Sequence, residues 1–222
     1  MTPLMVCGLV LWGTVVAVDL VTVPQGLLSR PLVAATVAGA ISGDAAAGLL
    51  AGMVLELYAL EVLPIGASRY PDYGPASVAG GAVAALVPGA TIGVAGVVAL
   101  PLAMLGGMSV HLHRRLTARA IEAKIGRVAA GDARAIWHLQ REGLLRDAAR
   151  GVLLSLVGVA AVALVTLIPW AGFDDLDLLN GAVLAGGITA ALGGALRSAG
   201  AGARRRLLLT GLVAGILVSI WQ

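Results

Sequence analysis

Residues 39–79 read GAISGDAAAGLLAGMVLELYALEVLPIGASRYPDYGPASVA. The stretch is apolar and rich in glycine, yet it contains five ionisable residues: Asp44, Glu56, Glu61, Arg69 and Asp72. Ionisable side chains at membrane depth are costly, and they are usually retained because they pair, line a polar cavity or bind a substrate. If the chain lies in a membrane, a functional site is therefore predicted within this stretch.

The composition indicates that the chain does lie in a membrane. Of its 222 residues, 59% are hydrophobic and 12% are charged, and the mean hydropathy is +0.96. A soluble domain carries about 25% charged residues. The 31 glycines are typical of helices that approach each other closely in lipid. The composition therefore predicts an all-α, polytopic integral membrane protein.

Cysteine and histidine indicate no metal or cofactor site. Cys7 is the single cysteine, which excludes an internal disulfide and a cysteine-based metal cluster. The spacing of His111, His113 and His138 fits no common ligand motif, and solvated or interfacial positions are the simpler interpretation. We therefore expect neither a metal nor a cofactor.

Basic residues gather in two clusters. Nine of the 15 Lys and Arg residues lie within residues 114–150, and four more are Arg197, Arg204, Arg205 and Arg206. The positive-inside rule places both clusters in the cytoplasm, where we expect them to be solvated. No recognition motif accompanies these charges, so nucleic-acid binding is not expected.

Two apolar runs between the clusters agree with that orientation. Residues 152–170 and 178–196 are each about long enough to cross a bilayer. The loop that joins them contains Asp174, Asp175 and Asp177 and no basic residue, so we expect it to be periplasmic. A further apolar run at residues 207–221 is short for a crossing.

The sequence divides into an N-terminal membrane region at residues 1–111, a cytoplasmic insert at 112–150 and a C-terminal membrane region at 151–222. In the insert, apolar residues recur at helical spacing, Gly131 ends one helix and Asp132 caps the next. We expect two amphipathic helices that lie on the membrane surface or pack on a partner. In the N-terminal region, prolines such as Pro88 interrupt the apolar runs, which predicts broken or re-entrant helices.

An ordered series of motifs covers residues 29–77: Ser29-Arg30-Pro31-Leu32, Gly43-Asp44, Gly48, Gly52, Leu55-Glu56-Leu57, Pro64-Ile65-Gly66-Ala67, Pro71-Asp72 and Ala76-Ser77. In this order and spacing, the chain resembles the IIC membrane component of the mannose/fructose/sorbose family of bacterial phosphotransferase systems. The resemblance continues more weakly through residues 99–107 and the insert to residues 197–200. It therefore extends over most of the chain.

The resemblance implies a function and a set of partners. In that family, the IIC and IID subunits form the membrane channel, and an elevator-like movement carries a bound hexose-type sugar across. A IIB protein, which IIA charges, phosphorylates the sugar, so IIC needs no catalytic nucleophile. The resemblance thus implies a multi-pass subunit of an oligomer in the bacterial cytoplasmic (inner) membrane.

Two other interpretations stay open. Pro64 stands where mannose-type members of the family have Asn, which favours a non-transporting membrane scaffold or regulatory relative of IIC. An unrelated secondary transporter is the third interpretation, and it explains the ordered motifs only by coincidence.

Glu56 matches the family glutamate and is the leading candidate for contact with the sugar. A carboxylate accepts hydrogen bonds from sugar hydroxyls, and we expect Gln25 or Asp19 to contribute from the preceding segment. The alternative for Glu56 is a structural hydrogen bond to a neighbouring break in the backbone.

Structural or pairing roles are expected for the other ionisable residues. Asp44 is predicted to cap the helix that follows it. Asp72 lies in a predicted turn, and Arg69 is positioned to pair with it or with Glu61. Arg30 either neutralises a buried carboxylate or reaches the membrane interface by snorkelling.

Overall fold

The computed structural model of the 222-residue chain describes residues 1–62, 68–87, 92–170 and 176–197, together with 200, 202, 203, 206, 209 and 210. The Pro64-Ile65-Gly66-Ala67 motif, Asp174, Asp175 and most of residues 198–222 lie outside this description. Within the described residues, every regular element is a helix: α1 (Pro3–Val21), α2 (Pro31–Ser42), α3 (Ala45–Ala59), α4 (Tyr73–Leu86), α5 (Ile92–Glu122), α6 (Ile125–Ala129), α7 (Ala133–Val165) and α8 (Leu176–Leu196).

Among the described residues, four helices are long and apolar enough to cross a membrane: α1, α5, α7 and α8. The predicted multi-pass helical architecture is thereby confirmed. α2, α3 and α4 have 12, 15 and 14 residues, whereas a crossing helix needs about 20. α4 ends at Leu86 with Val87 in an extended conformation, Pro88 lies outside the described residues, and Pro101 lies inside α5. Re-entry of a short helix into the membrane stays a prediction.

The short helices pack through small residues. α2 and α3 form a hairpin that turns at Gly43, whose φ of 104° is left-handed. A side-chain carbon on Gly39 would lie 2.7 Å from the Cα of Gly48, and one on Gly48 would overlap the Ala35 carbonyl. On the α4 side, a carbon on Gly81 would overlap the same carbonyl. The close helix approach that the glycine content predicts is present at Gly48, and α2 is held between α3 and α4.

We expect Gly48→Ala to destabilise the protein by about 1–3 kcal/mol, the usual cost of forcing extra atoms into a packed core. The added carbon would meet backbone atoms of α2, which cannot rotate away as the end of a side chain does. Gly143→Ala is the matched control, because a carbon added at that position in α7 has no neighbour within 4 Å. Thermal unfolding in detergent should give a lower midpoint for Gly48→Ala alone. Equal midpoints for the two variants would contradict this packing.

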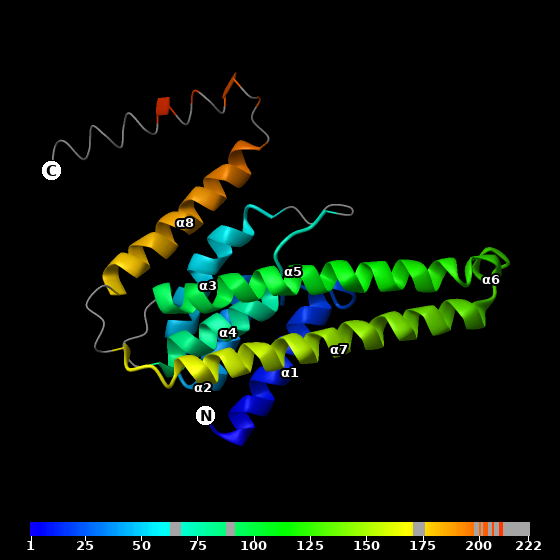
Figure 1. Cartoon of the computed structure of the whole chain (residues 1–222), viewed down its shortest axis with the longest axis horizontal. Coiled ribbons are helices and arrows are strands. Elements are labelled where there is room, and N and C mark those ends of the chain that lie inside the picture. The colour runs from blue at the N-terminus through cyan, green and yellow to red at the C-terminus, as the bar shows by residue number, and fades with distance from the viewer. Residues whose placement is uncertain are drawn as a thin grey trace.

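α5 and α7 lie side by side and extend beyond the other helices as an antiparallel arm, with α6 at its tip (Figure 1). α5 is 31 residues long and α7 is 33. The predicted insert therefore continues two long apolar helices instead of forming separate surface helices. The boundaries expected after residues 111 and 150 fall inside α5 and α7. Extending an existing helix requires no new nucleation, so a continuous helix is the favourable outcome.

The turn at the tip of the arm has the predicted caps. Gly131 has a φ of 73°, and Asp132 is the N-cap residue of α7. The Asp132 carboxylate accepts hydrogen bonds from the N–H groups of Arg134 and Ala135 at 3.0 and 3.2 Å, and from the Arg127 guanidinium at 2.7 Å. The hydrogen bond from Arg127, together with the backbone donors, lowers the pKa of Asp132 below its ordinary value. The cap is therefore charged at neutral pH.

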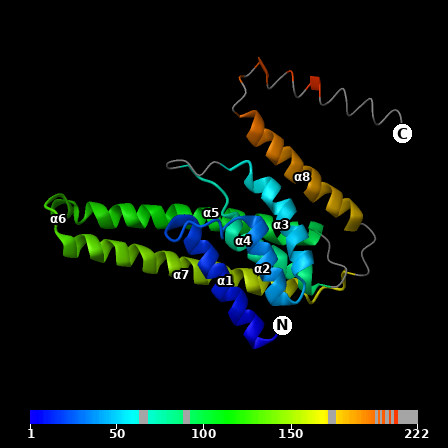
Figure 2. The same ribbon diagram turned by 180° about the vertical axis from the view of Figure 1, so that it is seen from behind.

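Seen from behind, α1 to α4 gather around the end of the α5–α7 pair that lies away from α6 (Figure 2). α8 packs on α3 and α5. The Tyr58 hydroxyl donates to the Val183 carbonyl at 2.7 Å, and the Asn180 side chain accepts from the Gly93 N–H at 2.9 Å. Apart from Val183 and Gly187, the side chains of α8 are partly or fully exposed. α8 thus presents apolar surface to lipid or to another subunit.

Candidate functional site

The segment of residues 22–30, which joins α1 to α2, is held by Asp19. This carboxylate lies in the last turn of α1, and the residue is 1% exposed. It accepts hydrogen bonds from the N–H groups of Gly26 at 2.6 Å and Ser29 at 2.9 Å. Within the segment, Gln25 and Leu27 have left-handed φ values of 57° and 68°. Non-glycine residues keep left-handed backbone conformations only where surrounding contacts stabilise them. The two hydrogen bonds to Asp19 are such contacts.

Glu56 lies on α3 and faces the end of the same segment. Its carboxylate forms an ion pair with the Arg30 guanidinium and accepts the Leu32 N–H at 3.2 Å. The Glu56 side chain is 17% exposed and that of Arg30 is 43% exposed. Of the two roles expected for Arg30, pairing with a carboxylate is the one observed. A carboxylate has about four lone-pair sites, so Glu56 retains the capacity to accept further hydrogen bonds.

Gln25 lines a cleft between this segment and the arm. The cleft has a volume of about 810 Å³, and Thr22, His113, Arg114 and Gln140 also line it. A second hollow, of about 80 Å³, lies beside Arg30. The structure therefore gathers Asp19, Gln25, Arg30 and Glu56 around one segment. We call this group the α1–α2 segment site.

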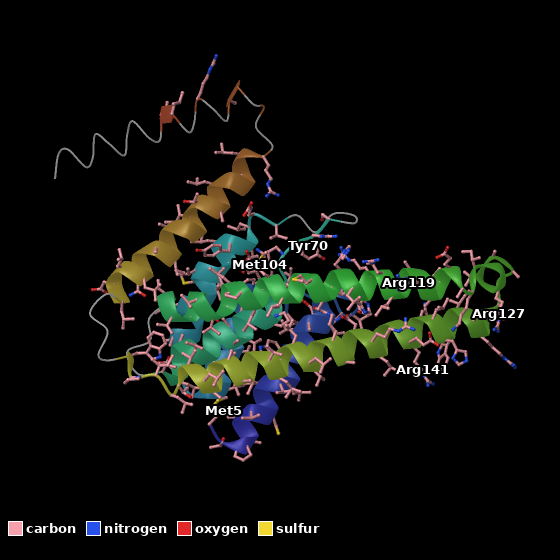
Figure 3. All side chains as sticks on the ribbon, in the orientation of Figure 1. Met5, Tyr70, Met104, Arg119, Arg127 and Arg141 are labelled. Atoms are coloured by element: carbon pink, nitrogen blue, oxygen red, sulfur yellow. The ribbon has the colours of Figure 1, made fainter. Side chains whose placement is uncertain are left out.

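Tyr70 lies near the α1–α2 segment site and ties it to the arm. The Arg114 guanidinium donates to the Tyr70 hydroxyl at 2.7 Å and to the Ser68 carbonyl at 3.2 Å. Its central carbon is 5.1 Å from the centre of the Tyr70 ring. Figure 3 shows Tyr70 where the arm leaves the helix bundle. Arg114 of the arm therefore lines one side of the cleft that contains Gln25.

The remaining predicted residues lie elsewhere. Asp44 caps α3 by accepting the Ala47 N–H at 2.9 Å. Glu61 pairs with Arg197 at 2.6 Å, near the ends of α3 and α8. The ion pairs that Asp72 and Glu61 form among the described residues are with other arginines, and the pairing expected of Arg69 is not among them. Asp72, which is fully buried, pairs instead with Arg150.

A buried ion network is the main feature that the sequence interpretation missed. Arg150 is 8% exposed, and its guanidinium donates to Asp72 at 2.8 Å, to Asp147 at 2.9 Å and to the Ala17 carbonyl at 2.8 Å. The Thr22 hydroxyl donates to the other oxygen of Asp147. The network joins α1, the start of α4 and α7.

The expectation that Arg150 is solvated with the other basic residues is wrong. Asp147 and Arg150 occur three residues apart, on one face of a helix, directly before the apolar run that begins at residue 152. That spacing is the sequence signal that indicates an ion pair at the membrane boundary.

No group of three His, Cys, Asp or Glu side chains is arranged to hold a metal ion in the part of the chain that the structure describes. The polar groups of the α1–α2 segment site are carboxylate, guanidinium and amide. Such groups recognise hydroxyl-rich ligands by hydrogen bonding.

The fold and this site define a multi-pass helical membrane protein with ionisable side chains held between its helices. Residues 4–200 match the family model of the sorbose-specific IIC component of the phosphotransferase system, EII-Sor. The chain therefore belongs to this family, and the resemblance drawn from residues 29–77 is confirmed.

Several characterised relatives are similar to this chain. The sorbose-specific EIIC component of Klebsiella pneumoniae is 38% identical over 88 residues, which is 40% of this chain and 33% of that protein. The mannose-specific EIIC component of Escherichia coli K12 is 27% identical over 167 residues, covering 75% and 62% of the two chains. The fructose permease IIC component of Bacillus subtilis is 28% identical over 172 residues, covering 78% and 63%. The chain thus matches less than two thirds of each relative.

Two solved structures have the same fold. One, described as a membrane protein, has a TM-score of 0.65 at 22% identity and covers 99% of this chain and 91% of that chain. The other is the mannose transporter ManYZ in complex with microcin E492, with a TM-score of 0.59 at 23% identity and coverage of 97% and 87%. At this level of identity, the similarity indicates the fold alone.

Proposed function

We propose that this chain is the membrane-spanning IIC subunit of a sugar phosphotransferase system and that it binds and translocates a hexose-type sugar. Membership of the EII-Sor family supports the class. The observation that carries the proposal is the Arg30–Glu56 pair at the end of the segment that carries Gln25, which lines the neighbouring cleft. Sugars are bound by side chains that offer donors and acceptors together, and this group offers both.

Each residue of the α1–α2 segment site has a role in this proposal. Glu56 accepts hydrogen bonds from sugar hydroxyls through the lone pairs that Arg30 and Leu32 leave unused. Gln25 adds an amide that both donates and accepts. Asp19 contributes by holding the segment that carries Gln25, since its two hydrogen bonds go to Gly26 and Ser29.

The hollow beside Arg30 must open for a sugar to reach from the Gln25 cleft to this part of the site. The hollow beside Arg30 measures about 80 Å³, whereas small-molecule sites usually measure about 300–1,000 Å³. An elevator-like movement of the core helices relative to the rest of the assembly would enlarge this hollow. It would also carry the site from one side of the membrane to the other.

Other subunits complete the proposed transporter. A IID membrane subunit would pack on this chain, and the exposed apolar side of α8 is a suitable surface for it. Phosphorylation of the arriving sugar is assigned to a IIB protein that IIA charges, so the transferred phosphoryl group never resides on this chain. The assembly would be an oligomer in the bacterial inner membrane.

A non-transporting scaffold is the second candidate. The observation that favours it is that Glu56 and Asp19 are already engaged by other groups of the protein. In a scaffold, these contacts would serve stability, and no sugar would compete for them.

Reconstitution separates the two candidates. The chain is incorporated into proteoliposomes with the IID protein of the same genome. Phosphorylated IIB is supplied on the side of the membrane that corresponds to the cytoplasm. We expect a radiolabelled hexose to accumulate as its phosphate only when all three proteins are present. A stable complex with IID that passes no hexose from a panel of common hexoses would overturn transport and support the scaffold.

A further inference from the structure

A further pocket, which Tyr70 also lines, lies between α5 and the segment that leads into α4. It has a volume of about 370 Å³, and Arg69, Met104, Met108, His111 and Arg115 line it. Gly107 creates the contact that forms it, because a side-chain carbon there would overlap the Tyr70 carbonyl oxygen. The segment therefore rests directly on α5 and places Arg69 beside that helix. We call this the α5 pocket.

One face of α5 gives the pocket its chemistry. Met104, Met108, His111 and Arg115 follow one another at intervals of four, three and four residues, so they form a single stripe along the helix. The stripe is apolar at its first two positions and basic at its last two. Met104 is 61% exposed and Met108 is 70% exposed. No acidic side chain lines the pocket among the described residues.

The length of α5 places this stripe relative to a bilayer. Its apolar part, residues 92–110, rises about 28 Å at 1.5 Å per residue, close to the hydrocarbon thickness of about 30 Å. His111 and Arg115 then lie at the headgroup level, and Met104 and Met108 lie within the hydrocarbon. Figure 3 shows Met104 near Tyr70, while Arg119 lies farther along the arm toward α6.

We propose that the α5 pocket binds an anionic phospholipid. Arg69, His111 and Arg115 contact the phosphate, and the first part of an acyl chain lies along Met104 and Met108. Basic pockets beside transmembrane helices on the cytoplasmic side suit anionic headgroups, and the flexible thioether chain of Met adapts to irregular apolar surfaces. A soluble phosphate would use the basic half alone and leave both methionines exposed. This proposal does not depend on the sugar.

Native mass spectrometry tests the proposal on the full chain, with any subunit that co-purifies. The protein is titrated with dioleoyl-phosphatidylglycerol or with dioleoyl-phosphatidylcholine. We expect one phosphatidylglycerol to bind about tenfold or more tightly than phosphatidylcholine. Arg69→Gln with Arg115→Gln should abolish that preference, since each basic residue near an anionic lipid contributes about a factor of five.

The matched control is Arg119→Gln with Arg134→Gln, which removes the same charge from the arm outside the pocket. This double variant should keep the preference. Met104→Gln with Met108→Gln provides an independent test, because it should weaken binding of the dioleoyl lipid while sparing the short-chain dihexanoyl form. Thermal unfolding of each variant establishes that it is folded.

Three results would overturn the proposal. The first is equal affinity for the two lipids, or an equal loss in the control variant. The second is complete displacement of phosphatidylglycerol by millimolar inorganic phosphate, which would indicate a site for soluble phosphate. The third is a co-purified subunit that crosslinks to Arg69→Cys and excludes lipid, which would indicate a protein contact.

Discussion

Replacing Arg150 with Met should lower the free energy of unfolding by about 3–5 kcal/mol, because removing one partner leaves uncompensated buried charge. Asp72 and Asp147 are both fully buried, and Arg150 is the cation that contacts them in the described residues. Met keeps much of the length and volume of the side chain, so the lost charge dominates the effect. Thermal unfolding in detergent, with yield of monodisperse protein, is the measurement.

Arg146→Met is the control for this prediction. Arg146 makes the same type of pair with Glu142, at 3.1 Å, but their side chains are 36% and 40% exposed. Exposed pairs contribute about 0–1 kcal/mol, so the control should unfold close to the wild-type midpoint. Adding Asp72→Asn and Asp147→Asn to Arg150→Met should recover part of the loss. If Arg150→Met unfolds at the wild-type midpoint, the network is not buried as described.

Replacing Glu56 with Gln should weaken binding of the transported hexose by about ten- to a hundredfold. Gln keeps the size of the side chain, but it removes the charge and turns one acceptor into a donor. Hydrogen bonds to charged groups contribute about 1.5–3 kcal/mol, and each factor of ten in affinity corresponds to about 1.4 kcal/mol. Isothermal calorimetry on the assembled protein, with the hexose identified by uptake, gives the affinity.

Glu61→Gln is the matched control, because Glu61 lies just past the end of α3 and forms an exposed ion pair with Arg197. The Glu61 side chain is 42% exposed and that of Arg197 is 52% exposed. Its affinity for the hexose should equal that of the wild type. Asp44→Ala, in contrast, should affect folding first, since it removes the N-cap of α3, which costs about 0.5–2 kcal/mol. Wild-type affinity in Glu56→Gln would assign Glu56 a structural role and favour the scaffold.

Local features of the fold were predictable because they depend on neighbouring residues. Asp44 is predicted to cap the helix that follows it, and Gly131-Asp132 predicts the turn at the tip of the arm. Both are present. Left-handed backbone at glycine and hydrogen bonds from Asp to the first turn are local properties. Gly39, Gly48 and Gly52 of residues 39–79 lie against backbone of the neighbouring helix, as the glycine content predicts for closely packed helices.

The ionisable pairs were not predictable in this way, because their partners are distant in sequence. Asp72 and Arg150 are 78 residues apart, and Glu61 and Arg197 are 136 apart. A charge count along the chain assigns Arg150 to the cytoplasmic cluster, although α7 brings it into the bundle. The continuation of α5 and α7 into the arm was not predictable for a related reason. Amphipathic periodicity indicates that residues 112–150 are helical, but it cannot distinguish a new helix from the continuation of α5 and α7.

The central claim is that a hexose binds at the α1–α2 segment site of this chain. The most direct measurement is a cryo-EM structure of the chain with its IID partner and the transported hexose. We predict density for the sugar with hydroxyl groups within about 3 Å of the Glu56 carboxylate and the Gln25 amide, and a hollow larger than the present 80 Å³. A sugar bound away from both residues, with Glu56 still covered by Arg30 and Leu32, would contradict the account.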